Sequence, residues 1–260
     1  MKHEIQAIFA IAIRDILRFT RDRPRIFASL IFPFIFIAVL GLSFQSSFGE
    51  DLPYNYLTFV FTGVFAQTLF QSTAMGVISI IEDRENNFTQ EIFVSPISRY
   101  SIIVGKIVGE TLVSFAQIVG VIFFGIILGV GFSVESLMLT FPAGLVAALF
   151  GGAFGVIVLS NLSTQRAANQ IFPFLMLPQF FLAGIFNPVK DLPLFLTILS
   201  RLAPMTYAVD FVRNAFYIGS DEAKFVTVYS GYVNLAIITV LFIIFITVGT
   251  YIFVRGERNK

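Results

Sequence analysis

The stretch FVTVYSGYVNLAIITVLFIIFITVGTYIFV, residues 225–254, contains no charged side chain. A helix needs about 20 apolar residues to cross the ~30 Å hydrocarbon layer of a membrane, so this stretch is long enough to span one. Other uncharged runs of sufficient length are residues 26–49, 52–81, 111–134, 136–165 and 167–189. Every backbone N–H and C=O must be paired inside hydrocarbon, and no alternating strand pattern appears. The runs therefore predict helices rather than a barrel.

The composition supports the same fold class. Hydrophobic residues make up 57% of the chain and charged residues 13%, whereas a soluble domain has about 45–50% and about 25%. We expect an all-α membrane protein in which residues 1–260 form one transmembrane domain. The six expected spans are residues 26–44, 57–81, 104–131, 137–160, 170–186 and 232–254.

Charge and cysteine content exclude several classes of site. The formal charge is close to neutral, so no nucleic-acid partner is expected. Cysteine is absent, which excludes disulfides and Cys-ligated metals. The first 25 residues carry charges throughout, so no cleavable signal is expected.

The distribution of Lys and Arg predicts the orientation. Six spans place both termini on one side, and the basic residues gather in the terminal segments and in the loops of that side. The two short loops on the other side carry only acidic charges, from Glu50, Asp51 and Glu135. Both termini are therefore expected in the cytoplasm.

Residues 1–25 have the pattern of an amphipathic helix on the inner membrane surface. One face carries Arg14, Arg18 and Arg21, which favour the anionic inner leaflet. The apolar positions at three- and four-residue spacing are Ile5, Ile8, Phe9, Ala12, Ile16 and Phe19. A short soluble helix is the alternative, although further apolar side chains leave it little polar surface.

The loop 82–101, between the second and third spans, is charged at its start and amphipathic in its middle. Ser95-Pro96 ends any helix there, because the residue before a proline avoids the α conformation. A short, stiff helix between two long spans is suited to transmit a push from a soluble partner. The alternative is a solvated charge cluster that covers the end of the second span.

The segment 187–231 is too long for a turn and too apolar to lie free in water. Its prolines divide it into short pieces. We expect two short helices, around residues 192–201 and 205–217, at or within the outer leaflet. An ordinary outer loop is the alternative.

Three motifs resemble the permeases of the type-2 export class of ABC transporters from bacteria and archaea. SPISR at 95–99 with GKI at 105–107 resembles the inner-loop signature of that family. NPVKDLP at 187–193 and LAPMTYAVD at 202–210 match its outer segment. The outer residues in or next to these motifs are Asn187, Pro188, Pro193, Pro204, Tyr207, Asp210 and Arg213. The order of the motifs and the six-span plan agree, so the resemblance covers nearly the whole chain.

The resemblance implies the membrane half of an ATP-driven exporter, in the plasma membrane of a bacterium or archaeon. Two such subunits pair, here as an expected homodimer in contact with membrane lipid, and each docks on a separate ABC ATP-binding subunit. No G-x-x-x-x-G-K-[S/T] loop occurs in the chain, so ATP and magnesium are expected on the partner, and no catalytic residue, cofactor or metal on this chain. In this family the inner loop supplies a coupling helix. The residues carried over to that role are Arg84, Glu85, Phe88, Glu91, Ile92, Phe93, Ser95 and Pro96.

Polar residues inside the spans are candidates for a cargo path. Glu110 shares a helical face with Gln117, and Gln67 with Gln71. Interhelical hydrogen bonds are the favoured interpretation of this seam. Lys106, one turn before Glu110, is a candidate ion-pair partner for it.

The leading hypothesis is a permease that exports an amphiphilic drug, antibiotic or lipid-like molecule. A polysaccharide or lipid-linked glycan exporter of the same family is the alternative. An ion-coupled secondary transporter needs several acids or histidines in its spans, and only Glu110 qualifies here. A membrane scaffold without transport activity is distinguished by the lack of an ATP-binding partner.

Overall fold

The computed structural model describes residues 2–85, 98–162 and 164–258, which form helices without any β-strand. Six residues of the predicted coupling helix lie outside the described residues; they are Phe88, Glu91, Ile92, Phe93, Ser95 and Pro96. Arg84 and Glu85 complete the last turn of a long helix.

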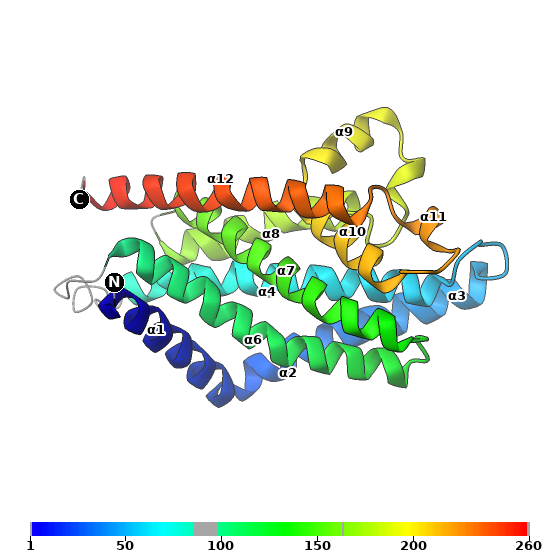
Figure 1. The fold of residues 1–260 in the computed structure, drawn as a ribbon, viewed down its shortest axis with the longest axis horizontal. Helices are drawn as coiled ribbons and strands as arrows, with labels where there is room; N and C mark the ends of the chain where they lie inside the picture. Colours follow the sequence, from blue (N-terminus) through cyan, green and yellow to red (C-terminus); the bar gives the residue numbers. More distant parts are fainter. Residues whose placement is uncertain (1, 86–97, 163, 259–260) are drawn as a thin grey trace.

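Long helices run side by side along the bundle (Figure 1). In chain order they are α2 (Arg23–Phe36), continued by the π-helical segment Ile37–Gly41 and α3 (Leu42–Phe48), then α4 (Tyr56–Glu85), α6 (Arg99–Ile127), α7 (Val134–Leu159), α8 (Gln165–Leu182) and α12 (Gly231–Arg258). The shorter elements are α1 (Lys2–Arg21), a 3-10 turn (Val189–Asp191), α9 (Leu194–Leu202), α10 (Pro204–Phe216) and α11 (Ala223–Val226).

The predicted all-α membrane class is confirmed. Within the described ranges, five helices are long and apolar enough to cross a membrane; they are Arg23–Ser47, Tyr56–Asp83, Arg99–Ile127, Val134–Leu159 and Ala223–Arg255. α9 and α10 reach this length only together, and they are bent by 88°. The described residues therefore contain five candidate spans, or six when the bent pair counts as one.

The helix at the predicted fifth span, α8, is not one of these five. Its 18 residues start with polar turns and include two prolines. It ends four residues earlier than predicted, because Gly184 takes a φ of 74°, a left-handed conformation that terminates helices. In Figure 1, α7 ends near the terminal side of the bundle and α12 begins at the opposite side, and α8 carries the chain between them. Both termini lie at the same end of the bundle (Figure 1).

Helices α4 and α7 form the centre of the bundle. Most residues of both are buried, whereas α2 and α12 are largely exposed. The two central helices approach closely at Gly151 and Gly155, where an added Cβ would collide with the backbone of Phe70 and Ala74. Small residues four apart permit such close packing in membranes.

Helix α1 packs along the outside of α6. The contact uses Gly105 and Gly109 of α6, which face the backbone of Ile8 and Ala12. The apolar side chains predicted on one face of α1 divide between two faces. Ala12 and Phe19 are buried against the bundle, and Ile5 and Phe9 are exposed. An exposed apolar line and a separate basic face match a helix at a membrane interface.

The predicted outer segment forms two short helices close to their predicted bounds. Pro193 precedes α9, and Pro204 occupies the first turn of α10, where a missing N–H costs nothing. α10 is buried in the bundle, whereas α9 exposes Leu194, Phe195 and Leu202.

Candidate functional site

A chain of buried ion pairs joins three helices at the terminal end of the bundle. Lys106 Nζ of α6 lies 2.8 Å from Asp15 Oδ1 of α1 and 3.7 Å from Glu110 Oε1 of its own helix. Glu110 Oε2 in turn accepts a hydrogen bond of 2.8 Å from Arg25 Nη2 of α2. The side chains of Asp15, Lys106 and Glu110 are each no more than 3% exposed. Buried charges are expensive unless paired, so these contacts fix α1, α2 and α6 relative to one another.

The ion pairs continue from α1 to the end of α4. Arg14 Nη2 lies 2.6 Å from Asp83 Oδ2, and Arg18 Nη2 lies 2.9 Å from Glu82 Oε1. Burial lowers the pKa of Arg14, but Asp83 and Asp15 raise it by more, so its pKa lies above the ordinary value. The described network contains four basic residues, Arg14, Arg18, Arg25 and Lys106, and four acidic ones, Asp15, Glu82, Asp83 and Glu110. Its formal charge is therefore zero.

Small residues make room for this network. Gly109 lies against Asp15 Oδ2, and an added Cβ there would lie 3.0 Å from that oxygen. Gly76 of α4 lies against the Glu110 carboxylate, where an added Cβ would collide with it. Larger residues at these two positions would push the acids out of reach of their partners.

A groove of about 540 Å³ lies between α2, α4 and α6 next to the network. Its α4 wall runs from Gln67 to Ser79, which at 1.5 Å per residue is about 18 Å. The wall thus extends from the middle of α4 toward its end at Glu85. Arg25 lines the groove at that end. The rest of the lining mixes apolar residues such as Phe32 and Met75 with Ser, Thr and Gln side chains. The volume lies within the ~300–1,000 Å³ that is usual for small-molecule sites.

The predicted polar seam lines this groove. Gln67, Gln71 and Gln117 all contribute to its wall. Gln67 Nε2 donates to Gln71 Oε1 at 3.1 Å, and Gln117 Nε2 donates to Ser72 Oγ at 2.9 Å. The Gln117–Ser72 bond joins α6 to α4 and is an interhelical bond of the kind expected, whereas the Gln67–Gln71 bond lies within α4. Glu110 is not among the lining residues, although it contacts two of them, Arg25 and Gly76.

The side-chain oxygen of Gln117 receives no hydrogen bond from the described residues. Its side chain is 2% exposed, and its Oε1 has no hydrogen-bond partner among the described residues. A buried polar atom without a partner costs about 1–3 kcal/mol. Gln117 is one of the residues that line the groove, so this unpaired oxygen belongs to a side chain of its wall.

The outer motif residues hold a second polar cluster. Asp210 of α10 accepts hydrogen bonds from Val228 N and Tyr229 N at 2.8 Å each, and from Asn234 Nδ2 at 2.7 Å. The carboxylate therefore fastens the turn before α12 to α10. Asp210 is almost completely buried, so its role in this structure is positional.

Arg213 is buried one turn further along α10. Its guanidinium lies 3.8 Å from the centre of the Phe59 ring, a cation–π distance. Its Nη2 donates to Phe59 O at 3.3 Å and to Ile185 O at 3.5 Å. Arg213 thus joins α10 to α4 and to the turn after α8.

The other outer motif residues occupy turns and caps. Tyr207 Oη donates to Arg201 O at 2.7 Å and spans the bend between α9 and α10. Pro188 precedes the 3-10 turn. Asn187 is exposed, away from the groove lining.

Two residues that join helices through buried polar contacts, Asp15 and Asn234, were not predicted from the sequence. Asp15 sits among the basic residues of α1, but it shares a face with Ala12 and Phe19, at spacings of three and four, and that periodicity marks it as buried. Asn234 is the single strongly polar residue in the apolar run of the last span, and an intramembrane amide signals a hydrogen-bonding partner.

Comparison with known proteins gives consistent matches. A family model described as ABC-2 type transporter matches residues 6–217. A putative transport permease ycf38 of Cyanophora paradoxa is 26% identical over 213 residues, covering 80% of this chain and 73% of that protein. Its counterpart in Pyropia yezoensis is 24% identical with the same coverage. The probable multidrug ABC transporter permease YbhR of Escherichia coli (strain K12) is 28% identical over 141 residues, 54% of this chain and 38% of that protein.

Proposed function

Because the chain belongs to the ABC-2 type transporter family, we propose that this permease subunit exports a neutral amphiphilic molecule by means of a separate ATP-binding subunit. The observation that carries the proposal is the groove between α2, α4 and α6. It combines amide side chains with apolar walls, and it contains an unused buried acceptor, Gln117 Oε1.

The charges around the groove favour a neutral cargo. Arg25 is the single charged residue among those that line it, and Glu110 already binds Arg25 at 2.8 Å. An anionic cargo at Arg25 would face the Glu110 carboxylate, and a cationic cargo would face Arg25 itself. A hydroxyl or amide group on an apolar body suits the wall better, because it supplies the donor that Gln117 lacks. The name of the relative YbhR, a probable multidrug permease, supports an amphiphilic small molecule.

The ATP-binding subunit would act on the segment between α4 and α6. These helices end at Glu85 and begin at Arg99, at the same end of the bundle as both termini (Figure 1). The basic residues of the chain concentrate in the loops and tails of that end, which supports a cytoplasmic location for it. We place both termini in the cytoplasm, and the protein in the plasma membrane of a bacterium or archaeon as a homodimer.

ATP would supply the energy through the partner. A conformational change needs a ligand that binds the two states with different affinity, and ATP on the partner meets that need. Since Lys106 follows the coupling segment by a few residues and binds Asp15, a push on the segment would move α6 and α1 together. Arg25 would transmit the movement to α2, one wall of the groove.

Ion coupling is less well supported by the site. An ion-coupled transporter needs an acid that gains and loses a proton along the path. Glu110 already forms ion pairs with Arg25 and Lys106, and it is not among the residues that line the groove.

The test uses the chain purified with its ATP-binding subunit and reconstituted in liposomes. Residues 86–96 are replaced by a Gly-Ser linker of equal length, and the control carries the same kind of linker at 218–222, in the turn before α11. We expect the first variant to keep its thermal stability but to lose the partner and ATP-driven transport. The control should keep both. If the 86–96 variant still co-purified with the partner and transported, the coupling assignment would be wrong.

A further inference from the structure

A second hollow, of about 810 Å³, lies along α1 and its junction with α2. One stripe of α1 lines it, formed by Ala10, Ile13, Arg14, Leu17, Arg18 and Arg21. Asp22 and Pro24 line it at the junction. It is separate from the groove at Gln117, because the two share no lining residue.

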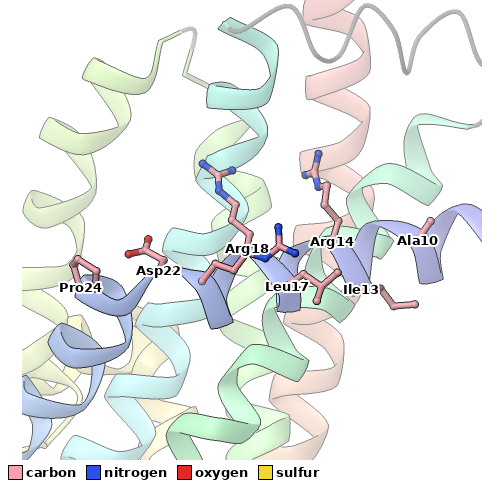
Figure 2. A pocket seen from close by; sticks show the side chains of 8 residues that line it. Ala10, Ile13, Arg14, Leu17, Arg18, Asp22 and Pro24 are labelled. Atoms are coloured by element: carbon pink, nitrogen blue, oxygen red, sulfur yellow. The ribbon is translucent and has the colours of Figure 1, made fainter.

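The basic and apolar side chains of this hollow point in opposite directions. In Figure 2, Arg14 and Arg18 extend from α1 toward the end of α4, whereas Ile13 and Leu17 extend from the other side of the helix. Ile13 is 55% and Leu17 is 48% exposed, so neither is used in packing the bundle. A helix at the interface places basic groups at the headgroups and apolar ones in the acyl region.

Three guanidinium groups line the hollow, and one of them forms no ion pair with the described residues. Arg14 and Arg18 bind Asp83 and Glu82. The Asp22 carboxylate caps α2 by accepting from Arg25 N at 3.1 Å. Arg21 makes no ion pair within the part of the chain that the structure describes.

We propose that this hollow binds one anionic phospholipid of the surrounding bilayer. Its phosphodiester would lie at Arg21, with Arg18 as the neighbouring donor, and one acyl chain would lie along Leu17 and Ile13. The Arg21 guanidinium is available to a phosphate because the neighbouring Asp22 carboxylate accepts from the backbone N–H of Arg25 and forms no ion pair with Arg21 in the described structure. Arg binds phosphate through two parallel N–H donors. Leu17 and Ile13 would then contact the acyl chain of the lipid whose headgroup is bound at Arg21. This lipid is a bound component of the subunit and differs from the cargo of the groove.

The binding would tie the surface helix to the leaflet. Arg14 and Arg18 link the same stripe of α1 to α4, so a lipid at Arg21 would stabilise the junction of α1 with α2 against the bundle. Removal of the lipid should therefore loosen α1 before it affects the centre of the bundle.

The experiment is native mass spectrometry of the detergent-purified subunit titrated with dioleoyl phosphatidylglycerol. The second arm uses dioleoyl phosphatidylcholine, which has the same chains and no net charge. The third arm adds glycerol 3-phosphate as a competitor that has the phosphate but no chains. We expect one phosphatidylglycerol to bind at least about fivefold more tightly than phosphatidylcholine, because a basic residue at an anionic surface contributes about that factor. Glycerol 3-phosphate should not compete.

Matched variants place the site. Arg21→Gln should weaken phosphatidylglycerol binding about fivefold, and Arg21→Lys should recover most of it. Arg23→Gln, which removes the same charge from a neighbouring exposed residue outside the lining, should change binding less than twofold. Leu17→Gln should weaken both lipids. Equal binding of the two lipids, equal effects of Arg21→Gln and Arg23→Gln, or full competition by glycerol 3-phosphate would each overturn the proposal.

Discussion

Lys106 Nζ lies 2.8 Å from Asp15 Oδ1, and both side chains are almost completely buried. The contact joins α1 to α6, which is long and apolar enough to span a membrane, across 91 positions of sequence. Lys106 also lies near Glu110, which binds Arg25, so one lysine connects α1 with α2 through α6. The pair is therefore the centre of the junction through which the proposed coupling segment would act.

Lys106→Met should destabilise the protein strongly. The variant leaves Asp15 without its closest cation and Glu110 with Arg25 alone, and breaking a buried pair costs about 3–5 kcal/mol. Thermal denaturation in detergent, followed by size-exclusion chromatography, measures the loss. The double variant Asp15→Asn/Lys106→Met should be less unstable than the sum of the two single variants, because each removes the charge that the other leaves unpaired. Lys224→Met, on an exposed lysine, is the control and should have little effect.

Gly151→Ala should separate the two central helices. The added Cβ would collide with the carbonyl of Phe70, which belongs to backbone and cannot rotate away. Overpacking of this kind costs about 1–3 kcal/mol. Gly131→Ala is the matched control, because no atom lies within 4 Å of its Cβ position. Equal melting temperatures of the two variants would contradict the close approach of α4 and α7.

Gln117→Leu should weaken cargo binding in the groove. The variant removes the free acceptor Oε1 together with the bond to Ser72. One lost hydrogen bond of about 1.5 kcal/mol corresponds to roughly a tenfold higher half-maximal cargo concentration. Cargo-stimulated ATPase activity of the reconstituted complex measures it. The control is Thr247→Val, which removes an exposed polar group from α12, away from the groove. It should leave the half-maximal cargo concentration unchanged. An equal effect of both variants would rule out a role for Gln117.

Glu4→Gln should lower stability at neutral pH but not in acid. The pKa of Glu4 is lowered below its ordinary value of 4.5, chiefly by a hydrogen bond from the Ser101 hydroxyl. The backbone N–H of Ser98 also donates to the carboxylate, at 3.1 Å. Burial raises the pKa, but by less than these hydrogen bonds lower it. A lowered folded-state pKa contributes stability above the unfolded pKa, and this is lost as the pH falls through the folded value. The difference in melting temperature between the two proteins should thus be full at neutral pH, decrease as the pH falls below 4.5, and vanish below the lowered pKa of the folded state. A difference independent of pH would show that the carboxylate charge has no part in it.

Asp210→Asn should loosen the turn before α12. The amide places an N–H₂ against one of the backbone donors, Val228 N or Tyr229 N, which then has no acceptor. The expected cost is about 1–3 kcal/mol, measured as thermal stability. Asp221→Asn, on an exposed residue in the neighbouring turn, should cost much less.

The described structure agrees best with the sequence-based predictions where the local sequence decides whether a helix forms or begins. Long uncharged runs predict the long helices, because an unpaired backbone is too costly in hydrocarbon. Pro193 and Pro204 predict the starts of α9 and α10 to within two residues, because proline fits best just before or in the first turn of a helix. The end of α8 differs, since apolar periodicity continues past Gly184 and the left-handed turn there does not appear in a hydropathy pattern.

The amino-acid sequence by itself determined that this chain is a helical membrane protein, where most of its long helices run and which polar residues lie in them. Only the tertiary structure decided the partners of those residues. Asp15 and Lys106, or Gln117 and Ser72, meet because two helices pack on particular faces. The physical reason is that helix periodicity records which residues share a face, whereas the choice of the opposite face depends on packing between segments far apart in the chain.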